Sequence, residues 1–284
     1  MKILVTGATG FIGNYVVEEL LRRNLQVTAS SSNEGKASKA NWFNKVSYIP
    51  FDLKDFSNDI NYYEFFQQPD AMIHLAWEGL PNYKSSFHEK INLPRHFLFL
   101  SNLISNGLSD LTVTGTCFEY GMQEGCLTED MPALPDNPYG TAKNLLRLKL
   151  ESFREQYLFS FKWVRLFYMY GEGQNPNSLL SQLDRALSDE QEVFNMSGGE
   201  QVRDYLPVQQ VAENIVSLAL QNKMEGVINN CSGNPIAVKE FVENYLKNIN
   251  KQITLNLGYY PYPDYEPMKF WGDTTKLKKA LNNE

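Results

Sequence analysis

The sequence is poor in features that define several large protein classes. It has three cysteines, Cys117, Cys126 and Cys231, without a Cys-x-x-Cys pair, and three histidines without the spacing of metal ligands. An odd cysteine count of this kind argues against a disulfide framework and a zinc site, and indicates a reducing compartment. No apolar run approaches the length of a membrane span. A strand pattern begins at residue 2 and leaves no signal peptide, so we predict a cytoplasmic protein without metal.

Positive charge is scarce as well. The chain has 26 Lys and Arg against 33 Asp and Glu, which gives a net charge of −7. A nucleic-acid-binding protein would need a basic stripe, and the sequence shows none, so we predict no nucleic-acid and no membrane partner. With 284 residues, of which 43% are hydrophobic, the chain can bury a large core as one domain or a domain and a half.

Strand and helix patterns alternate through the first two thirds of the chain. The strands are expected at 3–5, 26–30, 46–51, 71–76, 111–114 and 161–167, and the helices at 15–23, 93–105 and 138–153. Asn137 is a candidate N-cap for the last of these helices, with Pro138 at its first position. This alternation predicts a Rossmann-type, doubly wound α/β fold with a mostly parallel sheet covered by helices on both faces.

The pattern loosens after Gly171. Helices are expected at 179–188 and 211–221 and a strand at 227–230, and the Tyr- and Pro-rich tail 258–267 cannot be a regular helix. We therefore predict a dinucleotide-binding domain from 1–170, to which 204–232 return. The remaining parts, 171–203 and 233–284, are expected to form a substrate lid over the carboxyl ends of the sheet.

A glycine-rich turn follows the first strand directly. It reads Thr6-Gly7-Ala8-Thr9-Gly10-Phe11-Ile12-Gly13 and continues into a helical stretch. Glycines let a chain turn tightly and approach a pyrophosphate, whose charge is met by the amides of a helix N-terminus. An ordinary strand-to-helix turn needs only one glycine. The spacing therefore predicts dinucleotide binding by Gly7, Thr9, Gly10, Phe11, Ile12 and Gly13.

A second cluster reads Tyr139-Gly140-Thr141-Ala142-Lys143. Residues four apart share one face of a helix, so the phenol and the ammonium project to the same side. A cation about 4 Å away, at an effective dielectric near 20, stabilises a phenolate by roughly 4 kcal/mol, enough to lower a tyrosine pKa by about 3 units. We therefore expect Lys143 to make Tyr139 a usable general acid/base.

With both motifs present, the chain resembles the extended short-chain dehydrogenases/reductases, which include nucleotide-sugar epimerases, dehydratases and ketoreductases. His74-Leu75-Ala76, Asp52-Leu53, Asn92 and Arg203-Asp204-Tyr205 fit the same family. The resemblance implies that Asp52 and Leu53 hold the adenine and that Leu75, Ala76, Trp77 and Asn92 lie along the cofactor. It implies Thr116 as the third catalytic group. It also implies a phosphate contact for Arg203, and Tyr168 stands where the family has an Asn that often touches the diphosphate. Cys117, next to Thr116, and Tyr83, in a loop that could equally be a surface loop with an aromatic anchor, are further candidates for substrate contacts.

The resemblance also separates subclasses. Dehydratases of this family carry Asp-Glu directly after the catalytic Thr, whereas this chain has Cys117 and Phe118 there, so we expect no dehydratase. Glu119 is interpreted as a surface or supporting carboxylate without an assigned role. Ser31 stands where the family places an acid for the ribose. Together with Ser32 and Lys36 it could hold a 2′-phosphate, which favours NADP(H) over NAD(H).

The activity that the resemblance implies is NADPH-dependent reduction of a nucleotide-activated 4-keto-6-deoxy sugar, as in the dTDP-4-keto-6-deoxyhexose reductases that feed bacterial surface polysaccharides. Tyr139 would donate the proton, Lys143 would hold the nicotinamide ribose, and Thr116 would orient the carbonyl. The alternatives are an NAD-dependent nucleotide-sugar 4-epimerase and a dinucleotide-sensing module without turnover. A homodimer is expected, since such proteins often pair through the helix that carries the tyrosine and its neighbour.

Overall fold

The computed structural model describes residues 1–281. Within them the largest sheet has seven strands in the order β11-β7-β5-β4-β1-β2-β3, and every neighbouring pair is parallel. This confirms the predicted doubly wound α/β fold. The strand order reverses between β1 and β4, which is the switch point where open α/β sheets bind ligands. The strands are β1 (Lys2–Thr6), β2 (Gln26–Ser30), β3 (Ser47–Tyr48), β4 (Ala71–His74), β5 (Asp110–Thr116), β7 (Ser160–Leu166) and β11 (Gly226–Asn230).

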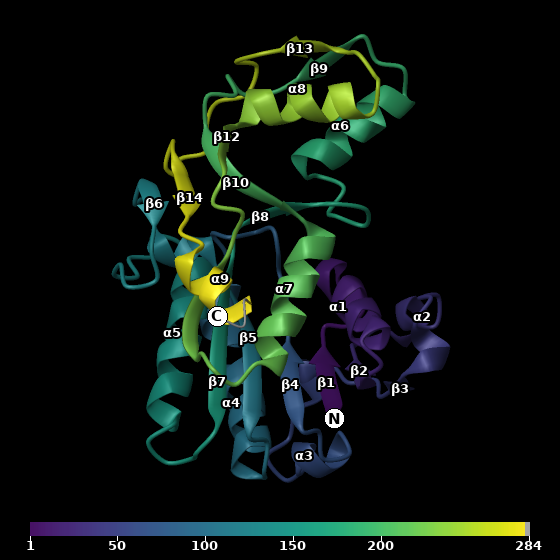
Figure 1. Ribbon diagram of the computed structural model, residues 1–284, viewed down its shortest axis with the longest axis vertical. Helices are drawn as coiled ribbons and strands as arrows, with labels where there is room; N and C mark the ends of the chain where they lie inside the picture. The colour runs from purple at the N-terminus through teal and green to yellow at the C-terminus, as the bar shows by residue number, and fades with distance from the viewer. Residues whose placement is uncertain (282–284) are drawn as a thin grey trace.

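Helices cover both faces of this sheet (Figure 1). On one face α1 (Phe11–Arg22) packs against α7 (Val208–Leu220), and on the other α4 (Leu93–Ser105) packs against α5 (Pro138–Phe153). Successive side chains of a strand point to opposite faces, so Ile3 packs in the core beneath α1 and α7, and Leu4 packs in the core beneath α4 and α5. Because both faces of the sheet are buried, its strands read as continuous apolar runs.

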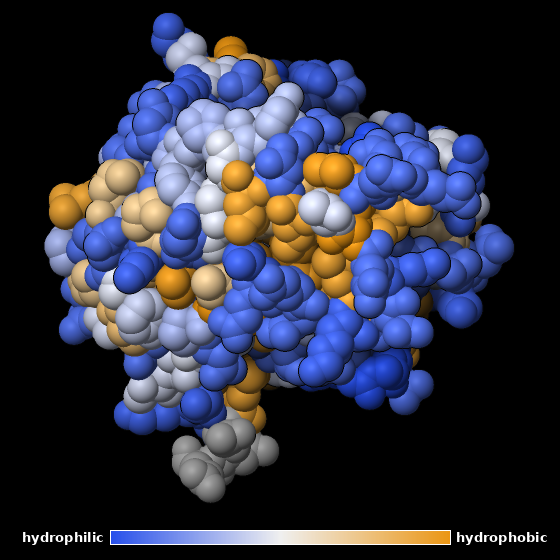
Figure 2. All heavy atoms as spheres, turned by 90° about the horizontal axis from the view of Figure 1, so that it is seen from above, coloured by the Kyte–Doolittle hydropathy of each residue, from blue (hydrophilic) through white to orange (hydrophobic). Residues whose placement is uncertain are grey.

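A smaller part lies beyond the carboxyl ends of the strands (Figure 1). It has its own apolar core, built around Leu183, Phe194 and Val242. Seen from above, the molecule is largely polar, with apolar side chains gathered in a hollow (Figure 2). The elements of the smaller part are the sheet β12 (Pro235–Ala237), β10 (Val202–Pro207) and β8 (Tyr168–Tyr170), the pair β9 (Val193–Asn195) and β13 (Thr254–Asn256), and the helices α6 (Leu179–Ser188) and α8 (Val238–Asn248).

The remaining described elements are short or terminal. The pair β6 (Gly125–Leu127) and β14 (Phe270–Gly272) lies at one side (Figure 1). The last helix, α9 (Thr275–Leu281), contacts α7 and β11, and its Leu277 is buried in the core of the large sheet. Residues 275–281, which were expected to belong to the lid, therefore pack on the sheet domain. Residues 282–284 of the expected lid lie outside the described residues. Two further one-turn helices are α2 (Glu34–Ala37) and α3 (Tyr62–Phe65).

Several predicted boundaries are confirmed and others are corrected. The helices α4, α5 and α6 begin and end where the pattern places them, and Asn137 caps α5 by accepting a hydrogen bond from the Gly140 amide. In contrast, α1 begins at Phe11, earlier than expected, and the strand expected at 46–51 shrinks to β3. The helix α8 was not predicted, although the spacing of its apolar residues Val238, Phe241, Val242, Tyr245 and Leu246 is helical. No helix within residues 1–281 is long and apolar enough to cross a membrane.

Candidate active site

The glycine turn joins β1 to α1 at the switch point. Gly7 has a φ of +73°, and a Cβ there would lie 2.7 Å from the amide nitrogen of Ala76. A Cβ on Gly13 would lie 2.1 Å from the carbonyl oxygen of Gly7. Both positions thus require glycine, because β4 and the first turn of α1 approach the turn at main-chain distance. The result is a helix N-terminus whose amides open onto the end of the sheet, which is the arrangement that binds a pyrophosphate.

A cavity of about 230 Å³ extends from this turn along β2 and β4. Most residues predicted to bind the cofactor line it, but Lys36 does not. The buried Oδ1 of Asn92 has no hydrogen-bond partner within residues 1–281, so it can accept a hydrogen bond from a ligand hydroxyl. The glycine turn and this free acceptor fit a dinucleotide. The predicted residues in the wall are Gly7, Thr9, Gly10, Ser31, Ser32, Asp52, Leu53, Leu75, Ala76, Trp77 and Asn92, and those that the sequence analysis missed include Phe51, Glu78, Arg95 and His96.

A second cavity, of about 400 Å³, adjoins the first. The two share Gly7, Gly10, Leu75 and Trp77 in their walls, so they form one groove across the switch point. Thr116, Tyr139 and Lys143 all line the second cavity, beside Phe11, Ile12 and Gly13 from the start of α1. The structure therefore brings the expected catalytic side chains next to the glycine turn, although they lie far apart in the chain.

Tyr139 and Lys143 lie on the buried face of α5. The Lys143 ammonium donates a hydrogen bond to the carbonyl of Thr114 (2.8 Å) and lies over the Trp77 ring, 4.1 Å from its centre. Burial lowers the pKa of Lys143 to about 7, and the negative charge of Glu119 opposes this shift. Burial also raises the pKa of Tyr139, with an opposing hydrogen bond from Thr116. The expected acidification of the phenol is thus wrong for this structure, because desolvation of the phenolate dominates.

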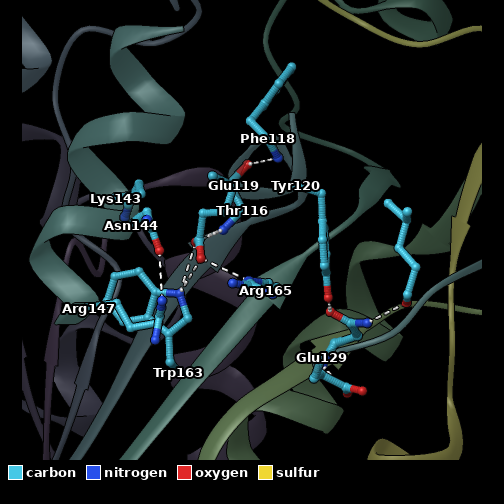
Figure 3. A network of polar contacts seen from close by, with 12 residues as sticks. Thr116, Phe118, Glu119, Tyr120, Glu129, Lys143, Asn144, Arg147, Trp163 and Arg165 are labelled. Atoms are coloured by element: carbon cyan, nitrogen blue, oxygen red, sulfur yellow. Dashed lines mark hydrogen bonds and ion pairs between the residues drawn. The ribbon is translucent and has the colours of Figure 1, made fainter. Parts of the chain in front are cut away.

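Thr116 ends β5 and begins the 3-10 helix η4 (Cys117–Tyr120). Its hydroxyl accepts a hydrogen bond from the Phe118 amide (3.3 Å), and its own amide donates to the carboxylate of Glu119 (2.9 Å; Figure 3). Glu119 is completely buried, which excludes a surface carboxylate and leaves the second interpretation, a supporting carboxylate. Side chains alternate between the two faces of the sheet only along β5. The 3-10 helix begins at Cys117, so alternation does not predict where the Glu119 side chain points. The Thr-x-x-Glu spacing of a capping box would have been the signal in the sequence.

The predicted substrate contacts fall into two groups. Tyr83, Cys117 and Tyr168 line the second cavity, together with Phe118, Gln174 and Asn175, which the sequence analysis did not assign. Arg203 does not line it: its buried guanidinium pairs with Glu266 (2.9 Å) and lies against the ring of Phe270. Burial raises the pKa of Cys117 to about 12, so its thiol is neither a nucleophile nor a general base at neutral pH.

Two of the three histidines pack against Trp77, and the third contacts one of these two. His74 contacts the Thr6 hydroxyl and a ring nitrogen of His96, each at 2.7 Å, as a satisfied core residue. The His96 ring stacks on Trp77, and the Trp77 indole donates to Nδ1 of His88 (3.1 Å). These contacts hold the indole beneath the Lys143 ammonium. The spacing of the three histidines in the sequence does not predict this cluster, because three different elements supply the rings.

An enzyme of the extended short-chain dehydrogenase/reductase class accounts for this groove, since one switch point holds both the dinucleotide turn and the Tyr-x-x-x-Lys pair. The chain belongs to the NAD dependent epimerase/dehydratase family, whose model matches residues 3–231.

Individual relatives share this architecture. The dTDP-6-deoxy-L-talose 4-dehydrogenase (NAD(+)) of Aggregatibacter actinomycetemcomitans is 30% identical over 96% of this chain and 99% of its own length. The dTDP-4-dehydro-6-deoxyglucose reductase of Escherichia coli is 22% identical over 89% of this chain and 83% of its own. The structure of a UDP-glucuronic acid 4-epimerase from Bacillus cereus in complex with UDP-glucuronic acid and NAD has a TM-score of 0.82 and 23% identity, over 99% of this chain and 93% of that one. That last likeness shows the fold.

Proposed function

We propose that this protein interconverts a keto group and a hydroxyl at C4 of a nucleotide-activated 6-deoxyhexose, acting as a 4-keto-6-deoxy sugar reductase. The observation that carries the proposal is the placement of Thr116, Tyr139 and Lys143 in one cavity next to the dinucleotide turn. The 30% identical relative is named for oxidation at C4 of a dTDP-linked 6-deoxy sugar, which is the same reaction in the opposite direction. Deoxysugar synthesis for surface polysaccharides is the setting that fits such an activity.

The wall of the second cavity supports a 6-deoxy sugar. Next to Thr116 it is formed by Cys117, Phe118 and Phe167, and Lys143 is the only charged side chain that lines it within residues 1–281. A methyl group at C6 gains from contact with such a wall, whereas a C6 carboxylate would lose its hydration without a partner. We therefore expect a UDP-uronic acid to be rejected.

The side chains divide the work of reduction. The Thr116 hydroxyl has a proton to donate to the substrate oxygen, since its acceptor side is taken by the Phe118 amide. Tyr139 holds its proton, because its pKa is raised, and can deliver it to the alkoxide that develops at C4. Lys143 is held in the cavity wall by Thr114 and Trp77, where it would hold the nicotinamide ribose. When bound, the nicotinamide supplies or accepts the hydride.

For the cofactor we propose NAD(H) in place of NADP(H), which the sequence favoured. Lys36 lies outside the cavity wall, and Arg95, the one basic side chain lining it within residues 1–281, pairs with Glu78 (3.6 Å). A 2′-phosphate beside Ser31 would thus meet hydroxyls, and the Arg95 guanidinium, whose Nη1 makes no hydrogen bond within residues 1–281, already faces the Glu78 carboxylate. The name of the 30% identical relative also specifies NAD(+).

The Ser31→Asp variant tests this cofactor assignment. An acid at the end of β2 bonds the ribose 2′-hydroxyl and repels a 2′-phosphate, so we expect kcat/KM with NADPH to fall by about tenfold or more and that with NADH to change little. Steady-state rates with both cofactors measure it, with Ser38→Asp as a control on the exposed end of α2. A wild-type enzyme that prefers NADPH would contradict the assignment.

A 4-epimerase is the second candidate, because the same three side chains serve both reactions and the Bacillus cereus structure is of an epimerase. The decisive experiment offers purified protein a panel of dTDP- and UDP-linked 4-keto and 4-hydroxy sugars with NADH and NADPH, and identifies products by NMR. Stoichiometric consumption of reduced cofactor supports the reductase. Turnover with cofactor that stays bound through gel filtration supports the epimerase, and no turnover of any sugar supports a dinucleotide-sensing module.

We also propose a homodimer, formed through α4 and α5, in a reducing compartment such as the cytoplasm. These two helices pack side by side and expose Leu98, Leu145 and Leu148 to solvent. A second copy of the same pair would cover these leucines in a two-fold interface.

Replacing Leu145 and Leu148 by aspartate tests the dimer. We expect the doubly substituted chain to be a monomer with unchanged secondary structure, since unpaired carboxylates are not tolerated in an apolar interface. Light scattering after size exclusion measures the mass. Leu158→Asp is the control, because Leu158 is 97% exposed just beyond α5. A wild-type chain that elutes as a monomer would disprove the proposal.

A further inference from the structure

Glu119 is a buried carboxylate with no substrate contact. Its side chain is fully enclosed and accepts hydrogen bonds from the Thr116 amide (2.9 Å), the Trp163 indole (2.9 Å) and Nε of Arg165 (2.8 Å; Figure 3). Burying a carboxylate is costly unless every lone pair is met by a donor or a countercharge. An ordinary helix cap at the surface needs none of this, so the network calls for a further explanation.

The first effect of this network is on the position of Thr116. Thr116 pairs with Leu166 in the sheet, and Trp163 and Arg165 lie on the same neighbouring strand, β7. The carboxylate therefore ties the end of β5 to β7 just where the main chain leaves the sheet for η4. With the main chain fixed there, the Thr116 side chain stays in the cavity wall that also holds Tyr139.

The second effect is on the charge around Lys143. The titratable groups that interact electrostatically with this ammonium are Glu119 from η4, His74 from β4, His88 from η3 (His88–Asn92) and His96 from α4, and Tyr139 lies four residues earlier on its own helix. Burial lowers the pKa of all three histidines and raises that of Tyr139, so these groups are neutral at pH 7. Glu119 is therefore the anion among them.

We propose that Glu119 is a positioning residue, whose carboxylate fixes the end of β5 that carries the Thr116 hydroxyl and supplies a negative charge to the Lys143 ammonium, which bonds Thr114 on the same strand. This inference rests on the proposed function, because it presupposes the roles of Thr116 and Lys143. It explains why a full negative charge is enclosed beneath a site whose wall carries no carboxylate within residues 1–281.

The test is the pH dependence of NADH binding, which needs no nucleotide sugar. Lys143 is cationic below its pKa of about 7 and neutral above it, so wild-type affinity falls as the pH rises through that value. Removing the charge in Glu119→Gln lowers the pKa of Lys143 further. We expect the binding midpoint to move down by about one pH unit. Fluorescence titrations with NADH at pH values from about 5 to about 9 measure the binding midpoint.

Matched variants separate charge from geometry. Glu119→Asp keeps the charge but shortens the side chain, so we expect a wild-type binding midpoint with kcat lowered by about 10²-fold through misplacement of Thr116. Glu129→Gln is the control: Glu129 is drawn in the same view and accepts a hydrogen bond from the Asn229 amide. Its substitution should leave the midpoint unchanged.

Each outcome decides one point. If Glu119→Gln does not fold, the double variant Glu119→Gln/Arg165→Met removes both buried charges together. It should fold and shift the midpoint in the same direction by a smaller amount, because the loss of the Arg165 cation partly offsets the loss of the anion. A midpoint equal to that of the wild type in the folded variant overturns the inference and leaves the proposed function standing. A wild-type protein that binds no NADH at any pH overturns the proposed function itself.

Discussion

Replacing Tyr139 by phenylalanine is expected to lower kcat by about 10²–10⁴-fold, the usual contribution of a positioned general acid. The substitution removes only the phenolic oxygen, and the ring keeps its contacts with Tyr83 and Phe118. Cofactor affinity and thermal stability should therefore remain close to those of the wild type. The measurement is steady-state turnover of the sugar identified in the panel, together with NADH titration and thermal unfolding.

The matched control for this prediction is Tyr245→Phe. Tyr245 also donates its hydroxyl proton to a neighbouring group, the Asp184 carboxylate, but it lies on α8 in the outer part of the molecule. We expect this variant to keep wild-type turnover. A Tyr139→Phe enzyme that retains more than about a tenth of wild-type kcat would show that another group delivers the proton.

Replacing Gly13 by alanine is expected to weaken cofactor binding by about 10²-fold, because the whole turn has to move. The added methyl would lie 2.1 Å from the Gly7 carbonyl oxygen and 2.8 Å from the Ala8 carbonyl carbon, both main-chain atoms without freedom to rotate away. Overpacking of this kind costs about 1–3 kcal/mol of stability. NADH titration measures the affinity, and thermal unfolding measures the destabilisation.

Gly35→Ala is the control for Gly13. A Cβ at Gly35 would have only the Asn33 side chain nearby, at 3.6 Å, so alanine should fit into α2 and stabilise the chain by about 0.4–1 kcal/mol. If Gly13→Ala bound NADH as tightly as the wild type, the turn would not be the pyrophosphate site. The two-cavity groove would then need another occupant.

Short-range patterns in the sequence predicted much of the fold. The bounds of α4 and α5 followed from apolar spacing and from the Asn137 cap, because a helix is decided by contacts within a few residues. For the same reason the glycine turn was recognised before its contacts were known. The short strands β8, β10 and β12 were missed, since each is only a few residues long and pairs with distant partners.

Chemistry that depends on burial could not be predicted in this way. Counting along the chain correctly placed Tyr139 and Lys143 on one face, yet the direction of the pKa shift of Tyr139 was wrong, because desolvation depends on everything packed around the phenol. Arg203 was assigned from a recognised motif, but its side chain pairs with Glu266 in the C-terminal tail. Lys36 follows Ser31 and Ser32 closely in the sequence, but unlike them it does not line the cofactor cavity.

The sequence by itself determined that a dinucleotide turn opens the first strand-helix unit and that a Tyr-x-x-x-Lys pair shares a helix face, since both are local facts of backbone geometry. The burial of Glu119 beneath Thr116, the stacking of His88 and His96 on Trp77, and the cavity that joins the turn to the proposed catalytic side chains all come from the tertiary fold. The physical reason is the parallel sheet. Its crossovers bring the carboxyl ends of distant strands together, and no pattern within one segment records which side chains meet there.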